Sequence, residues 1–285
     1  MKKAEKHITD KDVERALPTN RKEAFFDLLA HRKMTLFALS CFVFMFFIPL
    51  AVDLFVFNYF ETLAVANDKN GYLFSLFFYS MLVMLPCMII GFLGLVGGFY
   101  VAKRLVWQEG ISLANDFFQG IKENWKHAVI NGALFGLVLF GAVVGGCYLL
   151  IFSPTSPVWC GVGIGALVLL FLVIGMVVSL NLAQDVYYEN GYFVTMKNSF
   201  CFLGLLNWRV LVLFILSTGA VVALSFFNMV TLGIGLFLFA ALNSVVIVLY
   251  TLISHKAFDK YINSEHYPEM VNKGLYKKSE DHKEA

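Results

Sequence analysis

Residues 128–184 read AVINGALFGLVLFGAVVGGCYLLIFSPTSPVWCGVGIGALVLLFLVIGMVVSLNLAQ, and these 57 residues contain no Lys, Arg, Asp or Glu. As one straight helix the run would be about 85 Å long, whereas the hydrocarbon core of a bilayer is about 30 Å thick. We therefore expect it to cross a membrane twice. Residues 210–253 form a second charge-free run, of 44 residues, which should also cross twice.

Two shorter charge-free runs, residues 34–52 and 70–102, supply one predicted crossing each. The first is too long for a signal-peptide core, and 33 residues precede it, so we expect a retained span. The composition agrees, with 59% hydrophobic and 15% charged residues.

The sequence thus predicts an all-α, polytopic transmembrane helical bundle with six spans arranged as three hairpins. The expected spans cover about residues 35–58, 73–102, 128–152, 158–184, 210–228 and 230–254. Residues 1–34 are predicted to form a cytoplasmic N-terminal tail with a short amphipathic helix, and residues 255–285 a cytoplasmic C-terminal tail.

The basic residues fall on one side of this predicted membrane domain. Of 22 Lys and Arg residues, all but Lys69 lie in the tails or in the loops after the second and fourth spans. Because cytoplasmic loops carry an excess of Lys and Arg, both termini are expected in the cytoplasm of a multi-pass cell-membrane protein.

A repeated segment precedes the third and fifth spans. Residues 109–126 and 189–209 share the order Glu, Gly, Asn, Phe, Phe-x-Gly, Asn-Trp-basic, and a weaker copy lies at 23–33. In the copy before the third span, apolar residues recur at i, i+3, i+4, i+7 and i+11 from Ala114, which predicts an amphipathic helix at the membrane surface.

These surface helices have two interpretations. They could form a cytoplasmic docking collar for a partner, or simply anchor the chain to the lipid bilayer. The residues that would form such a collar are Phe117, Phe118, Ile121, Trp125, Phe200 and Trp208.

Few polar side chains fall in the spans, and the candidates are Asn131, Asn181, Gln184, Asn243 and Asp53. Asn131 and Gln184 lie near the predicted cytoplasmic ends, where hydration would satisfy them. Asp53 is expected at the outer surface. Asn243 is deep in a span, where either an interhelical hydrogen bond worth about 1 kcal/mol or contact with a transported substrate would explain it.

The sequence contains no recognisable catalytic, metal-binding or phosphate-binding motif. The charge-free runs also exclude paired carboxylates from the second to sixth spans. We therefore expect a protein that is not an enzyme and that uses no cofactor, metal or nucleic acid. Spaced glycines in the second and third spans permit close helix packing, either within one chain or in a homo-oligomer.

Three stretches resemble the signature of the YesL-like family: residues 85–91 (LPCMIIG), 98–104 (GFYVAKR) and 115–126 (NDFFQGIKENWK). This is a family of small bacterial polytopic membrane proteins without an assigned activity. The likeness covers about residues 70–255. The chain differs in having MIIGF after Leu-Pro, where Thr-Ile-Gly-Pro is usual, and in carrying an extra leading span and charged tails.

The family has no agreed catalytic residues to carry over. Its members often accompany carbohydrate uptake systems, which implies an accessory role beside a membrane-protein partner such as a sugar transporter. We therefore favour a non-enzymatic accessory or scaffold subunit. A small transporter or permease subunit is the alternative.

Overall fold

The computed structural model describes residues 18–66, 72–152, 157–219 and 228–276. These residues form an all-α bundle, and none of them lies in a strand. The long helices are α2 (Lys33–Ala66), α3 (Leu73–Val106), α4 (Leu113–Phe152), α5 (Pro157–Asp185), α6 (Tyr192–Phe214) and α8 (Met229–Phe258). The short elements are α1 (Arg21–His31), η3 (Ile215–Gly219), η4 (Asp259–Asn263), α9 (Ser264–His266) and η5 (Pro268–Met270).

Five helices are long and apolar enough to cross a membrane, namely α2, α3, α4, α5 and α8. The helix α6 would supply a sixth crossing if its two limbs, Tyr192–Leu206 and Trp208–Thr218 (the second continuing into η3), form one broken span. These limbs meet at an angle of 105°. The predicted fifth span, residues 210–228, lies only partly within the described residues.

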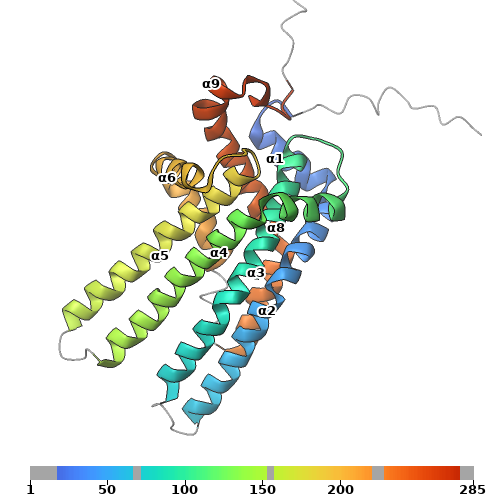
Figure 1. The fold of residues 1–285 in the computed structure, drawn as a ribbon. Coiled ribbons are helices and arrows are strands. Elements are labelled where there is room, and N and C mark those ends of the chain that lie inside the picture. Colours follow the sequence, from blue (N-terminus) through green and yellow to red (C-terminus); the bar gives the residue numbers. More distant parts are fainter. Residues whose placement is uncertain (1–17, 67–71, 153–156, 220–227, 277–285) are drawn as a thin grey trace, which may run out of the picture.

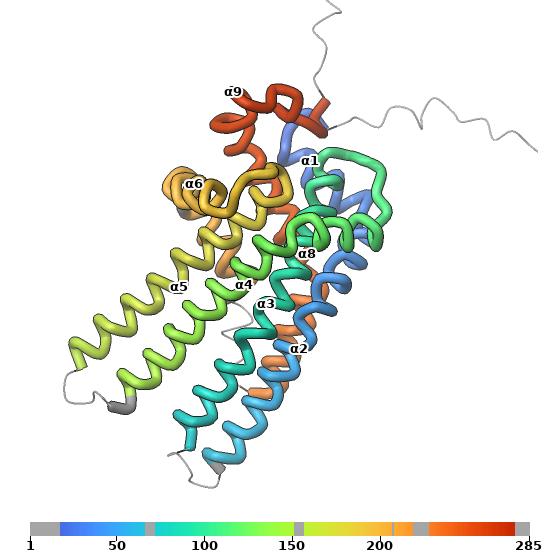
Figure 2. The backbone as a smooth tube through the Cα atoms, in the orientation of Figure 1, coloured from blue at the N-terminus to red at the C-terminus, as the bar shows by residue number. Residues whose placement is uncertain are grey.

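The helix α3 contacts α2, α4 and α8, while α5 packs mainly against α4 and α6 (Figures 1 and 2). Glycines allow these helices to approach closely. A Cβ atom at Gly94 would lie 2.6 Å from the Cβ of Phe46 on α2, and one at Gly132 would lie 2.8 Å from the Cα of Ile89 on α3. Most of the spaced glycines therefore serve packing within this chain, whereas an added Cβ at Gly141 would meet nothing within 4 Å.

Several segments gather at one end of the bundle, which we call the capped end. They are α1, the first turns of α4, the limb Tyr192–Leu206 of α6 and residues 259–276 (Figure 1). The helix α1 begins at this end, where Asn20 caps it by accepting a hydrogen bond of 2.9 Å from the backbone N–H of Glu23.

Two boundaries differ from those expected. The predicted surface helix before residue 128 and the third span form one continuous helix, α4, whereas the equivalent segment in α6 bends sharply. The helix α8 also continues to Phe258, past the predicted end of the sixth span at residue 254, and the described part of the C-terminal tail packs against the bundle. Phe258 is fully buried, and the N–H of Tyr276 donates a hydrogen bond of 2.9 Å to the carbonyl of Pro18.

Candidate functional site

Arg21 of α1 lies at the centre of a polar network at the capped end. Its guanidinium pairs with Asp259 and donates a hydrogen bond of 2.5 Å to Nδ1 of the fully buried His255. Because a guanidinium only donates, Nδ1 accepts this bond, while the indole N–H of Trp107 is directed at Nε2 of the same ring at 3.4 Å. That nitrogen lies 3.5 Å from Oδ1 of Asp259. Burial lowers the pKa of Arg21, and the charge of Asp259 opposes this shift.

Asp259 also holds the C-terminal segment. Its carboxylate accepts hydrogen bonds of 2.9 Å from the backbone N–H of Asn272 and 2.7 Å from the side chain of Asn263. The hydroxyl of Tyr188 donates to the same Asn263 side chain at 2.7 Å, and burial raises the pKa of that phenol. One carboxylate therefore joins α1, α8, the loop after α5 and residues 263–272.

A second set of charges fixes the loop between α3 and α4. Arg104 pairs with Asp116 and, at 3.2 Å, with Glu109. Lys273 lies 2.9 Å from Glu109, and its Nζ is 3.7 Å from the centroid of the Trp107 ring. Burial acts to raise the pKa of Glu109, but the bonds from Lys273 and Arg104 outweigh it, so this pKa lies below its ordinary value.

A third polar cluster joins α4, α5 and α6. His127 lies 2.8 Å from Asp185, and Asn131 accepts hydrogen bonds of 3.0 Å from Asn181 and 2.9 Å from the Tyr192 hydroxyl. Asn131 is fully buried, so the expectation that water satisfies it is wrong. Gln184 is likewise buried and donates at 2.7 Å to Ser199. Neighbouring helices supply these hydrogen bonds because α6 covers this end of α4 and α5, although the buried Oδ1 of Asn181 and Oε1 of Gln184 have no partner among the described residues.

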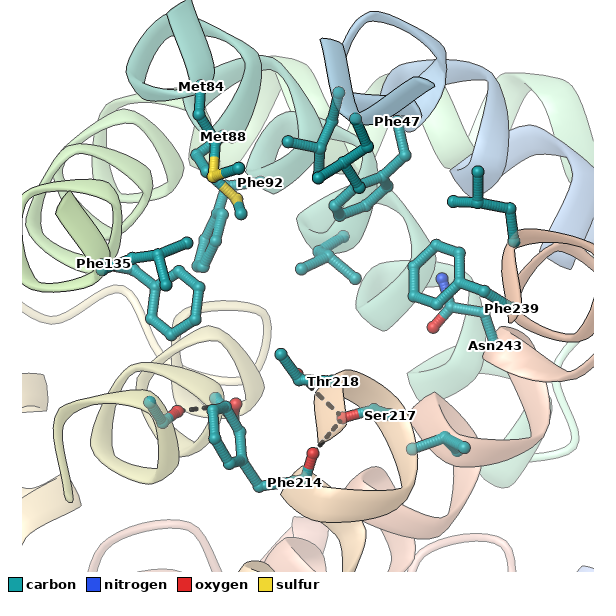
Figure 3. Close-up of a pocket in the computed structure, with 18 of the residues that line it drawn as sticks. Phe47, Met84, Met88, Phe92, Phe135, Phe214, Ser217, Thr218, Phe239 and Asn243 are labelled. Atoms are coloured by element: carbon teal, nitrogen blue, oxygen red, sulfur yellow. Dashed lines mark hydrogen bonds between the residues drawn. The ribbon is translucent and has the colours of Figure 1, made fainter. Parts of the chain in front are cut away.

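A cavity of about 210 Å³ lies deeper in the bundle, between α2, α3, α4, α5, α8 and η3 (Figure 3). Phe, Leu, Met and Val side chains form most of its wall. Its polar lining includes Ser217 and Thr218 of η3, Asn243 of α8 and the carboxyl group of Glu61 on α2. The expected interhelical bond does not hold the Asn243 amide, since its buried Nδ2 has no hydrogen-bond partner among the described residues.

Asp53 is buried against α3, and its expected place at the outer surface of the membrane stays a prediction. The helix α2 continues past it to Ala66, and the carboxylate accepts a hydrogen bond of 3.2 Å from Ser80 of α3. The end of the charge-free run therefore does not mark the end of the helix. A partner on α3 allows the carboxyl group to be buried.

The candidate docking residues separate into two groups. Phe117 is completely buried against Phe42 and Phe46 of α2, so it is not available to a partner. Ile121 is partly buried. The exposed members are Phe118 (54% exposed), Trp125 (49%), Phe200 (47%) and Trp208 (64%). Phe118 and Trp125 lie on α4 and the other two on α6, on a different side of the capped end (Figure 1).

Sequence reasoning missed Arg21 and Asp259 as organising residues. The pair is separated by 238 positions, and only the i, i+4 spacing of His255 and Asp259 gave a local signal. No family model, curated protein or solved structure matches the chain. The likeness to the YesL-like family therefore stays a prediction.

Proposed function

We propose that the chain is a six-span membrane protein of three hairpins, with both termini and the capped end in the cytoplasm. Support comes from the five apolar helices, from the sixth crossing that α6 would provide, and from the placement of charge. Lys33, Lys103, Lys122 and Lys256 belong to the capped-end portions of four different long helices. A cytoplasmic surface carries such an excess of basic residues.

We further propose that the protein acts as a non-enzymatic accessory or scaffold subunit. The observation that carries this proposal is the construction of the capped end. Ion pairs hold segments from both ends of the chain in one layer, and this layer leaves Phe118 and Trp125 exposed on α4. A fixed surface with large aromatic side chains suits a protein partner, because a few such anchors carry most binding energy.

The roles of the titratable groups agree with this view. Asp185 and Asp259 lie at the ends of helices, where they are bonded to fixed partners on other segments. Their bonds explain helix positions without invoking a reaction. The resemblance to the YesL-like family implies a carbohydrate uptake system as the partner.

The test is copurification from native membranes in mild detergent. Phe118→Ala combined with Trp125→Ala should release the partner, because losing about 3 kcal/mol weakens a complex about a hundredfold. The matched control is Tyr79→Ala with Trp159→Ala, which removes two exposed aromatic residues from other parts of α3 and α5. Equal partner recovery with all three proteins would contradict the docking role.

The internal cavity favours a second candidate function, a small transporter or permease subunit. Its wall offers an unpartnered Asn243 amide, although its mainly apolar surface suits a sugar poorly. Purified protein in liposomes should take up no labelled sugar if the accessory role is right. Uptake that is abolished by Asn243→Leu and unaffected by the Phe118 and Trp125 changes would support the transporter instead.

A further inference from the structure

A groove of about 380 Å³ opens at the capped end, between α1, α6 and the end of α8 with η4. The residues from α8 and η4 follow the spacing i, i+3, i+4, i+7, i+8, i+11 and i+12 from Leu249, so a single helix face forms one wall. Along this face the character of the side chains changes. Leu249, Leu252 and Ile253 come first, and Lys256 and Lys260 follow towards the capped end.

The other walls repeat this combination. The α6 limbs contribute Leu205, Leu206 and Arg209, and α1 contributes Lys22 and Phe25. The sharp bend after Leu206 allows residues from both limbs of α6 to line the same groove. The groove is therefore lined by apolar side chains and has basic side chains from three helices at its edge.

Within the described residues, no acidic side chain of the lining neutralises the charge of the groove. Arg21 also lines it, but that guanidinium is paired with Asp259. Lys22, Arg209, Lys256 and Lys260 make no ion pair within the described part of the chain, and no Asp or Glu belongs to the described lining. Four basic groups are therefore available to an anion.

We propose that this groove binds an anionic phospholipid of the cytoplasmic leaflet. Lys256, Lys260 and Arg209 would hold the phosphate, and an acyl chain would lie along Leu252 and Leu249. The separation from Leu249 to Lys260 is about 16 Å along the helix, enough for the phosphate to lie near Lys260 while the acyl chain lies deeper, near Leu249. Basic pockets between helices at the cytoplasmic side commonly hold anionic headgroups.

The position of the apolar wall distinguishes a lipid from an acidic peptide. Leu249, Leu252 and Ile253 belong to the charge-free run 210–253, which the proposed topology places inside the bilayer. A peptide would have to insert its backbone there, where lipid cannot satisfy its polar groups. This step rests on the proposed membrane placement of the capped end.

Native mass spectrometry of the full chain in mild detergent tests the site. We expect phosphatidylglycerol to bind at lower concentrations than phosphatidylcholine with the same acyl chains. Lys256→Gln with Lys260→Gln should weaken phosphatidylglycerol binding about thirtyfold, because two basic contacts are lost. Lys122→Gln with Lys126→Gln is the matched control, since it removes two exposed lysines from α4 outside the groove and should leave binding unchanged.

Two further variants separate binding from folding. Lys256→Arg with Lys260→Arg should retain the lipid, and Leu205→Asn, at an exposed position of the apolar wall, should weaken it while all the charges remain. Equal binding of both lipids, or an equal loss in the α4 control, would overturn the proposal. So would equally effective competition by glycerol phosphate, since this ligand has no acyl chain.

The outcome is independent of the accessory role. Partner copurification depends on Phe118 and Trp125, neither of which lines the groove. If the wild-type protein binds both lipids equally while Phe118→Ala with Trp125→Ala still releases the partner, the lipid site alone is refuted. If the groove variants weaken lipid binding as expected while Phe118→Ala with Trp125→Ala retains the partner, the docking surface alone is refuted.

Discussion

The ion pair between Arg21 and Asp259 joins residues separated by most of the chain, and both side chains are largely buried. A buried ion pair adds little stability compared with apolar packing of the same shape. Removing one partner nevertheless destabilises the fold, because the other charge is left buried and unpaired. The arrangement therefore makes the position of α1 against α8 depend on two specific side chains. Asp259 matters most, because it also accepts from Asn272 and Asn263.

Asp259→Asn should destabilise the folded protein by about 3–5 kcal/mol, because the buried Arg21 charge loses its counter-charge while the shape of the side chain is kept. Thermal unfolding in detergent should show a lowered midpoint. The control is Glu265→Gln, which removes an exposed carboxylate from the same segment and should leave the midpoint close to that of the wild type. A midpoint for Asp259→Asn within the error of the control would show that the network does not hold the capped end.

At the scale of the helix, α4 illustrates what the sequence can and cannot predict. The spacing of its aromatic residues correctly predicts a helix, because the periodicity of side chains is a local property. The same spacing does not show which aromatic residue packs inside the bundle and which is exposed, since apolar side chains are common in both places. The structure decides this through Gly97 of α3, where an added Cβ would lie 2.9 Å from the carbonyl oxygen of Phe117.

Phe117→Ala and Phe118→Ala form a matched pair that tests this assignment. The first should destabilise the protein by about 3–5 kcal/mol, because it leaves a cavity beneath Phe42 and Phe46. The second should change stability little, because about half of that side chain is exposed. Chemical unfolding in detergent measures both. Similar losses for the two variants would mean that α4 presents a different face to α2 and α3.

For the whole molecule, the charge-free runs predict the long helices well because hydrophobicity over about 20 residues is itself a local signal. They do not predict the polar clusters at helix ends. Asn131 meets Asn181, and Arg21 meets His255, only after the helices have packed. Hydration was therefore the simplest expectation for Asn131, and it fails because amide side chains find partners across the bundle.

The proposed orientation can be tested by labelling single cysteines in a chain whose five native cysteines have been replaced. The introduced residues are Asp68→Cys and Ser156→Cys, in two of the three predicted outer loops, and Lys122→Cys, on α4 at the capped end. A membrane-impermeant thiol reagent added to intact cells should modify positions 68 and 156 but not position 122, because the positive-inside bias places the capped end in the cytoplasm. Permeabilised cells provide the control, since all three cysteines should then react. Labelling of position 122 in intact cells would show that the orientation is the reverse of the one proposed. The groove lined by Lys256 and Lys260 would then face the outer leaflet.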